Sequence, residues 1–542
     1  MRIGKEHRDL GIVILFACLA NAVFLNQAYH IDEPCFLAIA KHILRDPLHP
    51  LNFRFNWSGQ SLPMGQINPN PTLVPYLLAC ALRLTGAREW ITRLVFIPFD
   101  CLAAAALYLL AARFLSMPLL PTLIVLAGPA YWINMQHLMA EKWMGAFGFT
   151  GIYVLVKSLQ EGKRPWFWFS AVLLGLAMTA KYSAVFLLPP ALLWAWQKRA
   201  PPRSIALHLF IAVSPPLCRL LWDLGLEPGR IASVWRHLAS GTVYPRLGWV
   251  HQMRSFLSFA GGCGVVTAVW PYLECRNPRR QDVILLTACI AAALLLFVPG
   301  FDLDPVRGID RITGILFSSG ALLALANIFR PRNIRSAGCS LWAPWILAVA
   351  VLQLFVYWSV VSRFILFAMP PMVFAAAAAL ELRENTSRLR RIYLVSLAGT
   401  AALSLGLGLV DYSYASAQRG LAQTIAERYL AQGRRVWFTG HWGLQYYLEE
   451  RGALGLDQAQ GGWDAVKSGD IVVVPSVNAL ILKPAPAPPS RAYQIQVDHF
   501  IPLRLISAWT GQGAFYTNAS GCFLPYSVSR EPVERFTVIQ KL

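Results

Sequence analysis

The sequence contains little charge and none of the short motifs that mark soluble enzymes. Only 14% of its 542 residues are Asp, Glu, Lys or Arg, whereas 56% are hydrophobic, and the mean hydropathy is +0.46. It has no GxGxxG after a strand, no P-loop, no HExxH and no GxSxG in a strand-turn-helix context. These absences exclude the common nucleotide-binding, zinc-protease and serine-hydrolase classes, and the composition indicates a polytopic membrane protein.

The ten cysteines show no CxxC pair and no Cys/His spacing typical of a metal site. Most of them lie inside apolar runs, so we interpret them as small buried hydrophobic residues. The segment Met1–Leu25 has a basic start and an apolar run, but no small-residue cleavage site precedes Tyr29. We therefore expect an uncleaved first helix and not a signal peptide.

The formal net charge of +20 does not indicate a nucleic-acid-binding surface. Lys and Arg number 36 against 18 Asp and Glu before Asp411, and 12 against 10 from Asp411 onward. The excess falls in short segments between apolar runs, where the cytoplasmic loops of membrane proteins collect it, and it forms no continuous face. We expect no nucleic acid among the partners.

Apolar runs of membrane-spanning length predict an all-α polytopic protein with about thirteen transmembrane helices. A further apolar helix, Thr72–Leu84, is short, and we expect it to lie at the membrane interface. The expected spans are Leu10–Ala28, Trp90–Ala112, Pro118–Gln136, Ala140–Val156, Pro165–Thr179, Ser183–Trp196, Ser204–Trp222, Ser255–Leu273, Asp282–Pro299, Ile312–Phe329, Leu341–Val360, Phe364–Leu380 and Ile392–Val410.

This assignment places six basic loops on the side of the basic N-terminus, as the charge bias of cytoplasmic loops requires. The loops contain Arg113; Lys157, Lys163 and Arg164; Lys198, Arg199 and Arg203; Arg276, Arg279 and Arg280; Arg330, Arg332 and Arg335; and Arg383, Arg388, Arg390 and Arg391. We therefore expect a bacterial inner-membrane protein with a cytoplasmic N-terminus. The first loop, 29–89, the Arg-rich loop, 223–254, and everything after Val410 then lie on the external, periplasmic side.

The chain divides into an expected transmembrane domain, 1–410, and a small periplasmic α/β domain, 411–542. The first external loop begins with an amphipathic helix, Pro34–Leu44, which we expect at the interface. Alternating strand patterns around a Pro-rich segment, Lys483–Ser490, mark the tail. Its expected elements are a helix at Ala415–Ala431, a strand at Arg435–Thr439, a helix at Trp442–Glu450, a strand at Ile471–Pro475 and strands near Ile501–Ala508.

Three acidic residues on the external side are candidates for catalysis. Asp32 and Glu33 follow the first span directly, and Glu141 opens a later one. Asp32 precedes Pro34, so it can equally be a helix N-cap, and a capped carboxylate is also a well-placed general base. For Glu141 the alternative is a solvated helix end paired with the neighbouring Lys142.

Four basic residues on the same side are candidates for binding an anion. Lys181 lies between two short apolar segments, with no acidic residue within fifteen positions on either side, so it either snorkels to the interface or binds an anion. Arg246 and Arg254 lie in the Arg-rich loop among aromatic residues, and Arg363 opens a late span. A phosphate clamp and snorkelling interfacial side chains are the two interpretations of these arginines.

A further anion-binding position is the start of the expected tail helix. Gly440, His441, Trp442 and Gly443 lie there, and free backbone N–H groups at a helix N-terminus can receive an anion. A plain strand-to-helix turn is the commoner explanation of such a segment.

The order of these features is similar to that of a known family. It consists of an acidic pair after the first span, two interfacial helices, a second external acid, the string GLAMTAKYSAVFLLPP and a late RFILFAMPP. In these features the sequence resembles the membrane glycosyltransferases of the GT-C superfamily, and within it the protein O-mannosyltransferases and lipid A aminoarabinose transferases. The similarity runs from Leu10 to Leu380, and the tail strings GHWGLQYYLEERGA and GDIVVVP are similar to a tail found on some bacterial members.

The resemblance implies a thirteen-span fold and inverting transfer of a sugar from a polyprenyl-phosphate donor to an acceptor hydroxyl on the external face. Asp32 matches the catalytic Asp of the family and Glu33 its neighbour, while Lys181 matches the Lys of the "TK" string. Glu141 stands where the family usually has Asp. Arg363 matches the Arg of the "RY" string, in which Phe364 replaces the common Tyr.

The sequence leaves the acceptor open between a protein, lipid A and another glycan. No cofactor is required for this chemistry because the phosphate is already a good leaving group, although a divalent metal remains possible. The main alternative is a transporter or flippase of lipid-linked sugars, which would also need external arginines. Transporters more often show two related halves and charges at mid-membrane, and the sequence shows neither.

Overall fold

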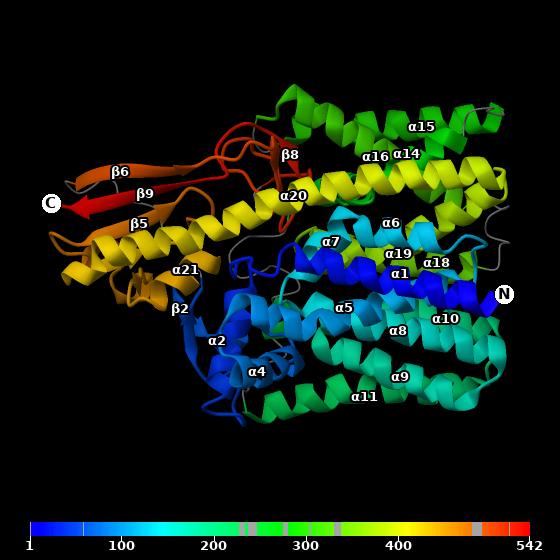
Figure 1. Cartoon of the computed structure of the whole chain (residues 1–542), viewed down its shortest axis with the longest axis horizontal. Coiled ribbons are helices and arrows are strands. Elements are labelled where there is room, and N and C mark those ends of the chain that lie inside the picture. The colour runs from blue at the N-terminus through cyan, green and yellow to red at the C-terminus, as the bar shows by residue number, and fades with distance from the viewer. Residues whose placement is uncertain are drawn as a thin grey trace.

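The computed structural model of the chain describes residues 2–57, 59–226, 233–236, 247–274, 280–302, 305–329, 338–479, 490–519 and 521–542. Most helices run along the long axis of the molecule, with the N-terminus at one end and a sheet and the C-terminus at the other (Figure 1). The expectation of a mainly helical chain is therefore confirmed.

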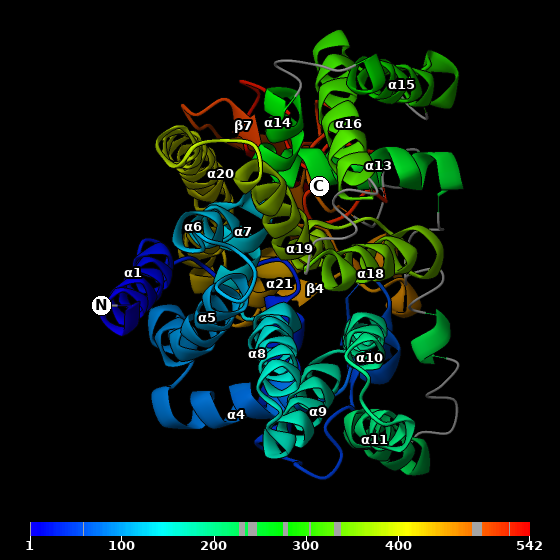
Figure 2. The ribbon, with the colours of Figure 1, turned by 90° about the vertical axis from the view of Figure 1, so that its right-hand side faces the viewer.

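Five helical segments in the described part of the chain are long and apolar enough to cross a membrane. They are Glu89–Ala111 in α5, Pro202–Gly225 in α11, Gly308–Ile328 in α16, Ser362–Glu381 in α19 and Thr386–Gln432, which contains α20. Most of the α19 window, 83%, is buried by neighbouring helices, against 50% or less for the other four. Figure 2, which views the helices nearly end on, accordingly shows α19 in the middle of the group. The total of thirteen spans stays a prediction.

Several expected spans agree with single helices. These are α1 (Arg2–Ala22), α5 (Glu89–Ala111), α8 (Ala140–Glu161), α9 (Arg164–Ala180), α11 (Pro202–Leu226), α15 (Arg280–Leu296), α16 (Gly308–Ile328) and α19 (Ser362–Glu381). The two expected interfacial helices are α2 (Glu33–Ile43) and α4 (Leu73–Thr85). Between them lie the short hairpin of β1 (Arg54–Asn56) and β2 (Ser61–Pro63) and the single turn α3 (Met64–Ile67).

Four expected spans are broken, so their description as single helices is wrong. The segment Pro118–Gln136 divides into α6 (Leu119–Ala127) and α7 (Pro129–Gln136) at Gly128, whose backbone is extended before a proline. The other three divide into a 3-10 helix (Tyr182–Leu187) and α10 (Leu188–Gln197), into α13 (Trp249–Cys263) and α14 (Val265–Glu274), and into α18 (Cys339–Val351) and a π-helical turn (Leu352–Val356). Lys181, which precedes the 3-10 helix, and Tyr357, which follows the π-helical turn, line the cavity described below.

The expected boundary at Asp411 falls inside one continuous helix, α20 (Thr386–Arg428). The separate tail helix expected at Ala415–Ala431 is therefore wrong. The last apolar run ends at Val410, but the polar Asp411 that follows it and Tyr414 are buried and do not face solvent. In Figure 1, α20 runs from among the other helices to the sheet and joins the two parts of the chain.

The tail forms a five-stranded mixed sheet in the order β4-β3-β5-β9-β6. Strand β3 (Val436–Phe438) pairs in parallel with β4 (Leu454–Gly455) and β5 (Ile471–Pro475), and helix α21 (Trp442–Glu449) lies between β3 and β4 in the chain. Strand β9 (Glu534–Lys541) runs antiparallel to both β5 and β6 (Ser490–Val497). The segment expected to form strands near Ile501–Ala508 contributes only β7 (Leu503–Arg504), paired with β8 (Ser527–Val528).

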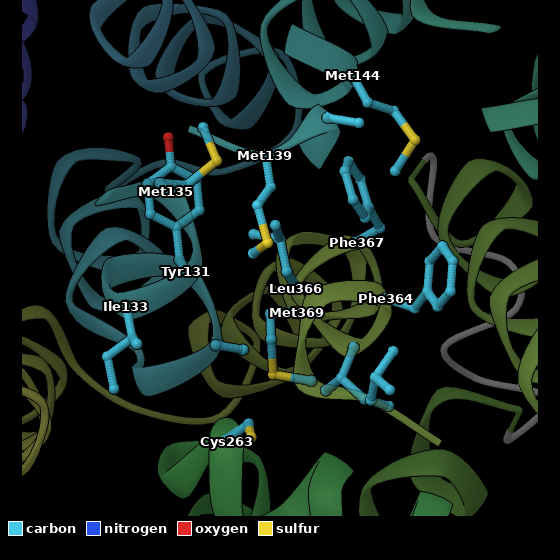
Figure 3. Close-up of a cluster of buried hydrophobic side chains, with 14 of the residues drawn as sticks. Tyr131, Ile133, Met135, Met139, Met144, Cys263, Phe364, Leu366, Phe367 and Met369 are labelled. Atoms are coloured by element: carbon cyan, nitrogen blue, oxygen red, sulfur yellow. The ribbon is translucent and has the colours of Figure 1, made fainter. Parts of the chain in front are cut away.

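A methionine-rich core lies where α7, α8 and α19 meet. Figure 3 shows Met139 pointing toward Leu366 of α19, with Phe367 and Met369 close by. All four side chains are buried. The flexible methionine side chains can fill the irregular gaps between helices whose ends do not line up. It supports the first turns of α8 and α19, which carry two of the candidate site residues.

Candidate active site

A cavity of about 320 Å³ lies between helix ends, the first loop and the tail. This volume lies within the usual range of small-molecule sites. Four of the seven candidate residues line it, namely Asp32, Glu141, Lys181 and Arg363. They come from four different elements, so the cavity brings together charges that are far apart in the sequence. The prediction that these four lie on one face of the molecule agrees with the cavity, and the membrane side of that face stays a prediction.

Asp32 is the N-cap residue of α2, but its side chain does not cap the helix. Its Oδ2 instead accepts a hydrogen bond of 2.5 Å from Nη1 of Arg363, at the start of α19. The Asp32 side chain is 31% exposed and lines the cavity. The choice between a cap and a site residue is thus decided by geometry, because the carboxylate reaches outward from its own helix.

Glu141 and Lys181 form a second ion pair in the same cavity wall. Glu141 lies in the first turn of α8, and its Oε1 accepts a hydrogen bond from Nζ of Lys181. The same oxygen lies 3.9 Å from Nε of Arg363. Lys142, suggested as the alternative partner of Glu141, instead pairs with Asp100 of α5 at 2.6 Å. Lys181 does not snorkel, since it is only 7% exposed.

The four charges therefore form one chain of contacts: Asp32, Arg363, Glu141 and Lys181. Burial alone would raise the pKa of Asp32, but the guanidinium of Arg363 and the charge of Lys181 hold that pKa below its usual value. The carboxylate is accordingly ionised at neutral pH. Two anions and two cations in one wall leave the cluster formally neutral, which lowers the cost of burying it.

The backbone around the cavity contains unusual conformations. Among the described residues other than glycine, positive φ angles occur at Ile31 (53°), Trp442 (66°), Asn478 (68°) and Arg199. The first three line the cavity. For the β-branched Ile31 a positive φ is costly, and such strain persists only where the surrounding structure enforces it. The backbone conformation of Ile31 thereby sets the direction of the backbone at Asp32.

The tail supplies a large share of the cavity wall, which the sequence did not predict. His441 and Trp442 at the start of α21, Ser476 and Asn478 after β5, and segments between Ile506 and Cys522 all line it. The ring of His441 lies 4.5 Å from that of Trp57, in the first external loop. Burial lowers the pKa of His441 to about 3, so the ring is neutral at physiological pH. The only sequence signal was the interpretation of Gly440–Gly443 as an anion-binding helix start.

Glu33 does not line the cavity, although it directly follows Asp32. Its carboxylate receives hydrogen bonds from Nη1 and Nη2 of Arg93 at 2.8 and 3.0 Å, from the backbone N–H of Leu138 at 2.7 Å and from that of His30 at 3.0 Å. The side chain is fully buried. Burial disfavours its charge, but Arg93 and His137 hold the pKa of Glu33 well below its usual value.

Of the two candidate arginines from the Arg-rich loop, the structure describes only Arg254. Arg254 is fully buried in α13 and does not line the cavity. Its Nη1 donates to Asp302 at 2.9 Å, and its guanidinium lies 4.4 Å from the ring of Phe523. The structure therefore does not bring Arg254 to the other candidates. Arg246 lies outside the described residues.

The remaining walls suit a sugar. The lining includes the aromatic residues Trp57, Tyr357, Trp358 and Trp442 and the amide and hydroxyl residues Asn68, Asn70, Ser507 and Thr517. Aromatic faces can pack against the C–H faces of a pyranose, and polar groups between them can bind hydroxyls. A charged cluster at one wall and a mixed aromatic and polar lining elsewhere define a site for a polar ligand with an anionic group.

One family model matches part of the chain. The family model of the dolichyl-phosphate-mannose-protein mannosyltransferases matches residues 69–222, which include Glu141 and Lys181. The resemblance to membrane glycosyltransferases of this kind, drawn from the sequence, is thereby confirmed.

Two solved structures of one bacterial protein are similar to the chain. The structure of ArnT from Cupriavidus metallidurans in the apo state is similar to this chain with a TM-score of 0.45 and 14% identity, over 86% of this chain and 93% of that one. The same protein bound to undecaprenyl phosphate gives a TM-score of 0.39 and 13% identity over the same shares. No curated protein matches the chain in sequence.

Proposed function

We propose that the protein is an integral-membrane glycosyltransferase that moves a sugar from a polyprenyl-phosphate donor to an acceptor hydroxyl on the external face of a bacterial inner membrane. The observation that carries the proposal is the contact chain of Asp32, Arg363, Glu141 and Lys181 in one cavity wall. The matched family, named for transfer of mannose from dolichyl phosphate, supports the donor class.

Asp32 is the general base in this proposal. It lines the cavity with its side chain partly exposed, whereas Glu33 is saturated by buried donors and Glu141 is engaged by Lys181. The carboxylate takes the proton of the acceptor hydroxyl as the new glycosidic bond forms, and the bond between the sugar and the donor phosphate breaks. Attack on the face opposite the leaving phosphate in one displacement inverts the configuration.

Lys181 and Arg363 bind the donor phosphate. Both cations reach the cavity, and the negative charge on the departing phosphate increases in an oxocarbenium-like transition state. Arg363 offers a planar fork of donors and Lys181 a point charge, which together fit a phosphodiester. Glu141 contacts one cation and lies close to the other, so we assign it the role of positioning both.

Binding of the donor also changes the base. In the structure the strongest contact of Arg363 is with Asp32, so a phosphate that takes over this guanidinium competes directly with the carboxylate. Loss of the Arg363 contact removes the main attraction that keeps the pKa of Asp32 low. The proposed base therefore becomes more basic only when the donor is in place.

The test is transfer by the purified full-length protein in detergent, with synthetic polyprenyl-phosphate sugars and mass-spectrometric detection of released polyprenyl phosphate. Asp32→Asn is expected to abolish turnover while leaving donor binding within severalfold of wild type. The matched control is Asp46→Asn, because Asp46 is also an acid of the first external loop but is 40% exposed and pairs with His49. Full activity of Asp32→Asn contradicts the assignment of the base.

The same assay separates transfer from transport. A detergent micelle has no second compartment, so a flippase cannot show turnover there. Release of the sugar from its lipid in the micelle therefore excludes pure transport. Binding of the donor without any release, over a range of candidate acceptors, favours the transporter.

A further inference from the structure

A second polar cluster adjoins the cavity wall at Tyr516. It contains His30, His137 and Asp411, with Gln27 and Tyr516 in contact with them. His30 and His137 are fully buried, and none of the other three is more than 4% exposed. None of these groups has a part in the proposed transfer reaction, so the cluster needs its own explanation.

The ligand-type atoms of this cluster converge on a small volume. Oδ2 of Asp411 lies 3.1 Å from Nε2 of His30 and 3.7 Å from Nε2 of His137, and all three atoms lie within 4.8 Å of one another. Metal–nitrogen and metal–oxygen bonds of about 2.0–2.2 Å in a tetrahedron place neighbouring ligand atoms about 3.3–3.5 Å apart. The two spacings from Asp411 bracket this value, and the three ligand-type atoms all lie within 4.8 Å of one another, so shifts of side chains are needed to close the coordination shell.

Charge gives a second reason to expect a cation. Within the described part of the chain, the ion-pair partners of Asp411 are the two histidines, and neither Lys nor Arg contacts it. A buried carboxylate without a cation is expensive. The negative charge is compensated either by a proton on one imidazole or by a metal ion between the side chains.

The groups around His137 leave room for a metal ligand. Its Nδ1 has no hydrogen-bond partner and lies 3.8 Å from Oε1 of Glu33, the nearest acid on that side. Without a metal, a proton on Nε2 of His137 donates to the hydroxyl of Tyr516 at 3.1 Å, which in turn donates to Oδ1 of Asp411. With a proton on Nδ1 instead, the lone pair of Nε2 faces Oδ2 of Asp411 at 3.7 Å, and a cation can lie between them. A histidine backed by a carboxylate is the usual outer-shell arrangement of a metal ligand.

Gln27 can complete the shell. Its Nε2 lies 2.8 Å from Oδ2 of Asp411 and 3.1 Å from Nε2 of His30, while its Oε1 has no partner. The two ends of an amide have nearly the same shape, so a rotation of 180° brings the oxygen to the same place. The cluster then offers two imidazole nitrogens and two oxygens.

We infer that His30, His137 and Asp411, with the amide oxygen of Gln27, bind one divalent transition-metal ion, for which the nitrogen and oxygen donors and the tetrahedral spacing best fit zinc. The site joins four segments distant in sequence, because Gln27 and His30 follow α1, His137 follows α7, Asp411 lies in α20 and Tyr516 belongs to the tail. It is structural, and it fixes the loop that carries the proposed base. The inference does not depend on the proposed transferase activity.

The first test is the metal content of the full-length protein, purified in detergent without chelators and measured by inductively coupled plasma mass spectrometry. We expect one zinc ion per chain. After removal of the metal with a chelator, titration with Co²⁺ is expected to give the visible absorption of a tetrahedral site, saturating at one equivalent. Both measurements use the wild-type chain and so do not depend on the folding of any variant.

Variants locate the ion. Asp411→Asn and His137→Gln are expected to lose the bound metal and the Co²⁺ absorption. The matched control is His208→Gln, because His208 is also a buried histidine but bonds to Ser170 at the interface of α9 and α11; this variant is expected to retain one ion. Wild-type protein without stoichiometric metal and without Co²⁺ absorption overturns the inference in favour of a protonated histidine. Retention of the metal by both cluster variants overturns it as well.

Discussion

Replacing Glu33 by Gln separates the roles of two adjacent acids. The carboxylate of Glu33 accepts hydrogen bonds from four donors, two of them on the guanidinium of Arg93. A glutamine keeps the size of the side chain but offers one oxygen, and its NH₂ group then faces donors. At least one backbone or guanidinium donor loses its acceptor, and Arg93 is left as a buried charge without its counter-ion.

The expected cost follows from this loss. Removing one partner of a buried ion pair destabilises a protein by about 3–5 kcal/mol, mostly because the other charge stays buried. The unfolding entropy of about 2.1 cal/mol/K per residue gives about 1.1 kcal/mol/K for the whole chain, if it unfolds as one unit. The Glu33→Gln variant should therefore melt about 3–4 °C below the wild type.

The assay is thermal unfolding of the purified variants in the same detergent, followed by intrinsic tryptophan fluorescence. Asp32→Asn serves as the comparison, because Asp32 is partly exposed to the cavity and its partner Arg363 keeps Glu141 nearby. We expect Asp32→Asn to melt closer to the wild type than Glu33→Gln does. In turnover the order should be reversed, with residual activity for folded Glu33→Gln and none for Asp32→Asn.

A double-mutant cycle shows whether the pair itself carries the effect. Arg93→Gln combined with Glu33→Gln removes both charges, so the double variant should be less destabilised than the sum of the two single variants. Additive losses would refute the ion-pair explanation. A Glu33→Gln protein that melts like the wild type but shows no turnover would instead place Glu33 in the chemistry.

Two further perturbations test the cavity wall and its junction with the tail. Arg363→Gln removes a cation that lowers the pKa of Asp32, so Asp32 should be protonated up to a higher pH. The acidic limb of the kcat/KM profile should therefore lie at a higher pH than in the wild type. An acidic limb at the wild-type pH contradicts the contact between Arg363 and Asp32. Gly443→Ala places a methyl group against the carbonyl oxygen of Tyr29, so it should destabilise the protein by about 1–3 kcal/mol in the same thermal assay. The control is Gly399→Ala in α20, where nothing lies within 4 Å of the added methyl group, and it should be neutral or stabilising.

That four of the candidate residues lie close together was the part of the site that the sequence predicted best. Charge bias placed Asp32, Glu141, Lys181 and Arg363 on one external face, and the cavity brings these four together. The rule works because it depends on loop composition and not on any long-range contact. Arg254 satisfies the same rule but does not reach the cavity, since its partner Asp302 is supplied by a segment 48 residues away.

The contribution of the tail was not predictable in the same way. His441 and Trp442 face Asp32 across the cavity only because α21 packs against the first loop, where the N–H of Tyr29 donates to the hydroxyl of Tyr447, 418 positions away. The continuous α20 was also missed, because polar residues such as Asp411 look like a helix end until the groups that bury them are known. Both errors come from long-range packing, which overrides local propensity.

The different roles of Asp32 and Glu33 show the same limit at the scale of one peptide bond. Because a helix has 3.6 residues per turn, successive side chains point about 100° apart. One of two adjacent acids at the start of a helix can therefore face a cavity while the other faces the core. The sequence shows the pair but not the direction of each side chain. That choice is made by two arginines, Arg93 at 60 positions from Glu33 and Arg363 at 331 positions from Asp32, each of which pairs with one acid. An acid that accepts four buried hydrogen bonds cannot also take a proton from a substrate, so the partners of each residue, and not its place in the motif, decide which of the two is the base.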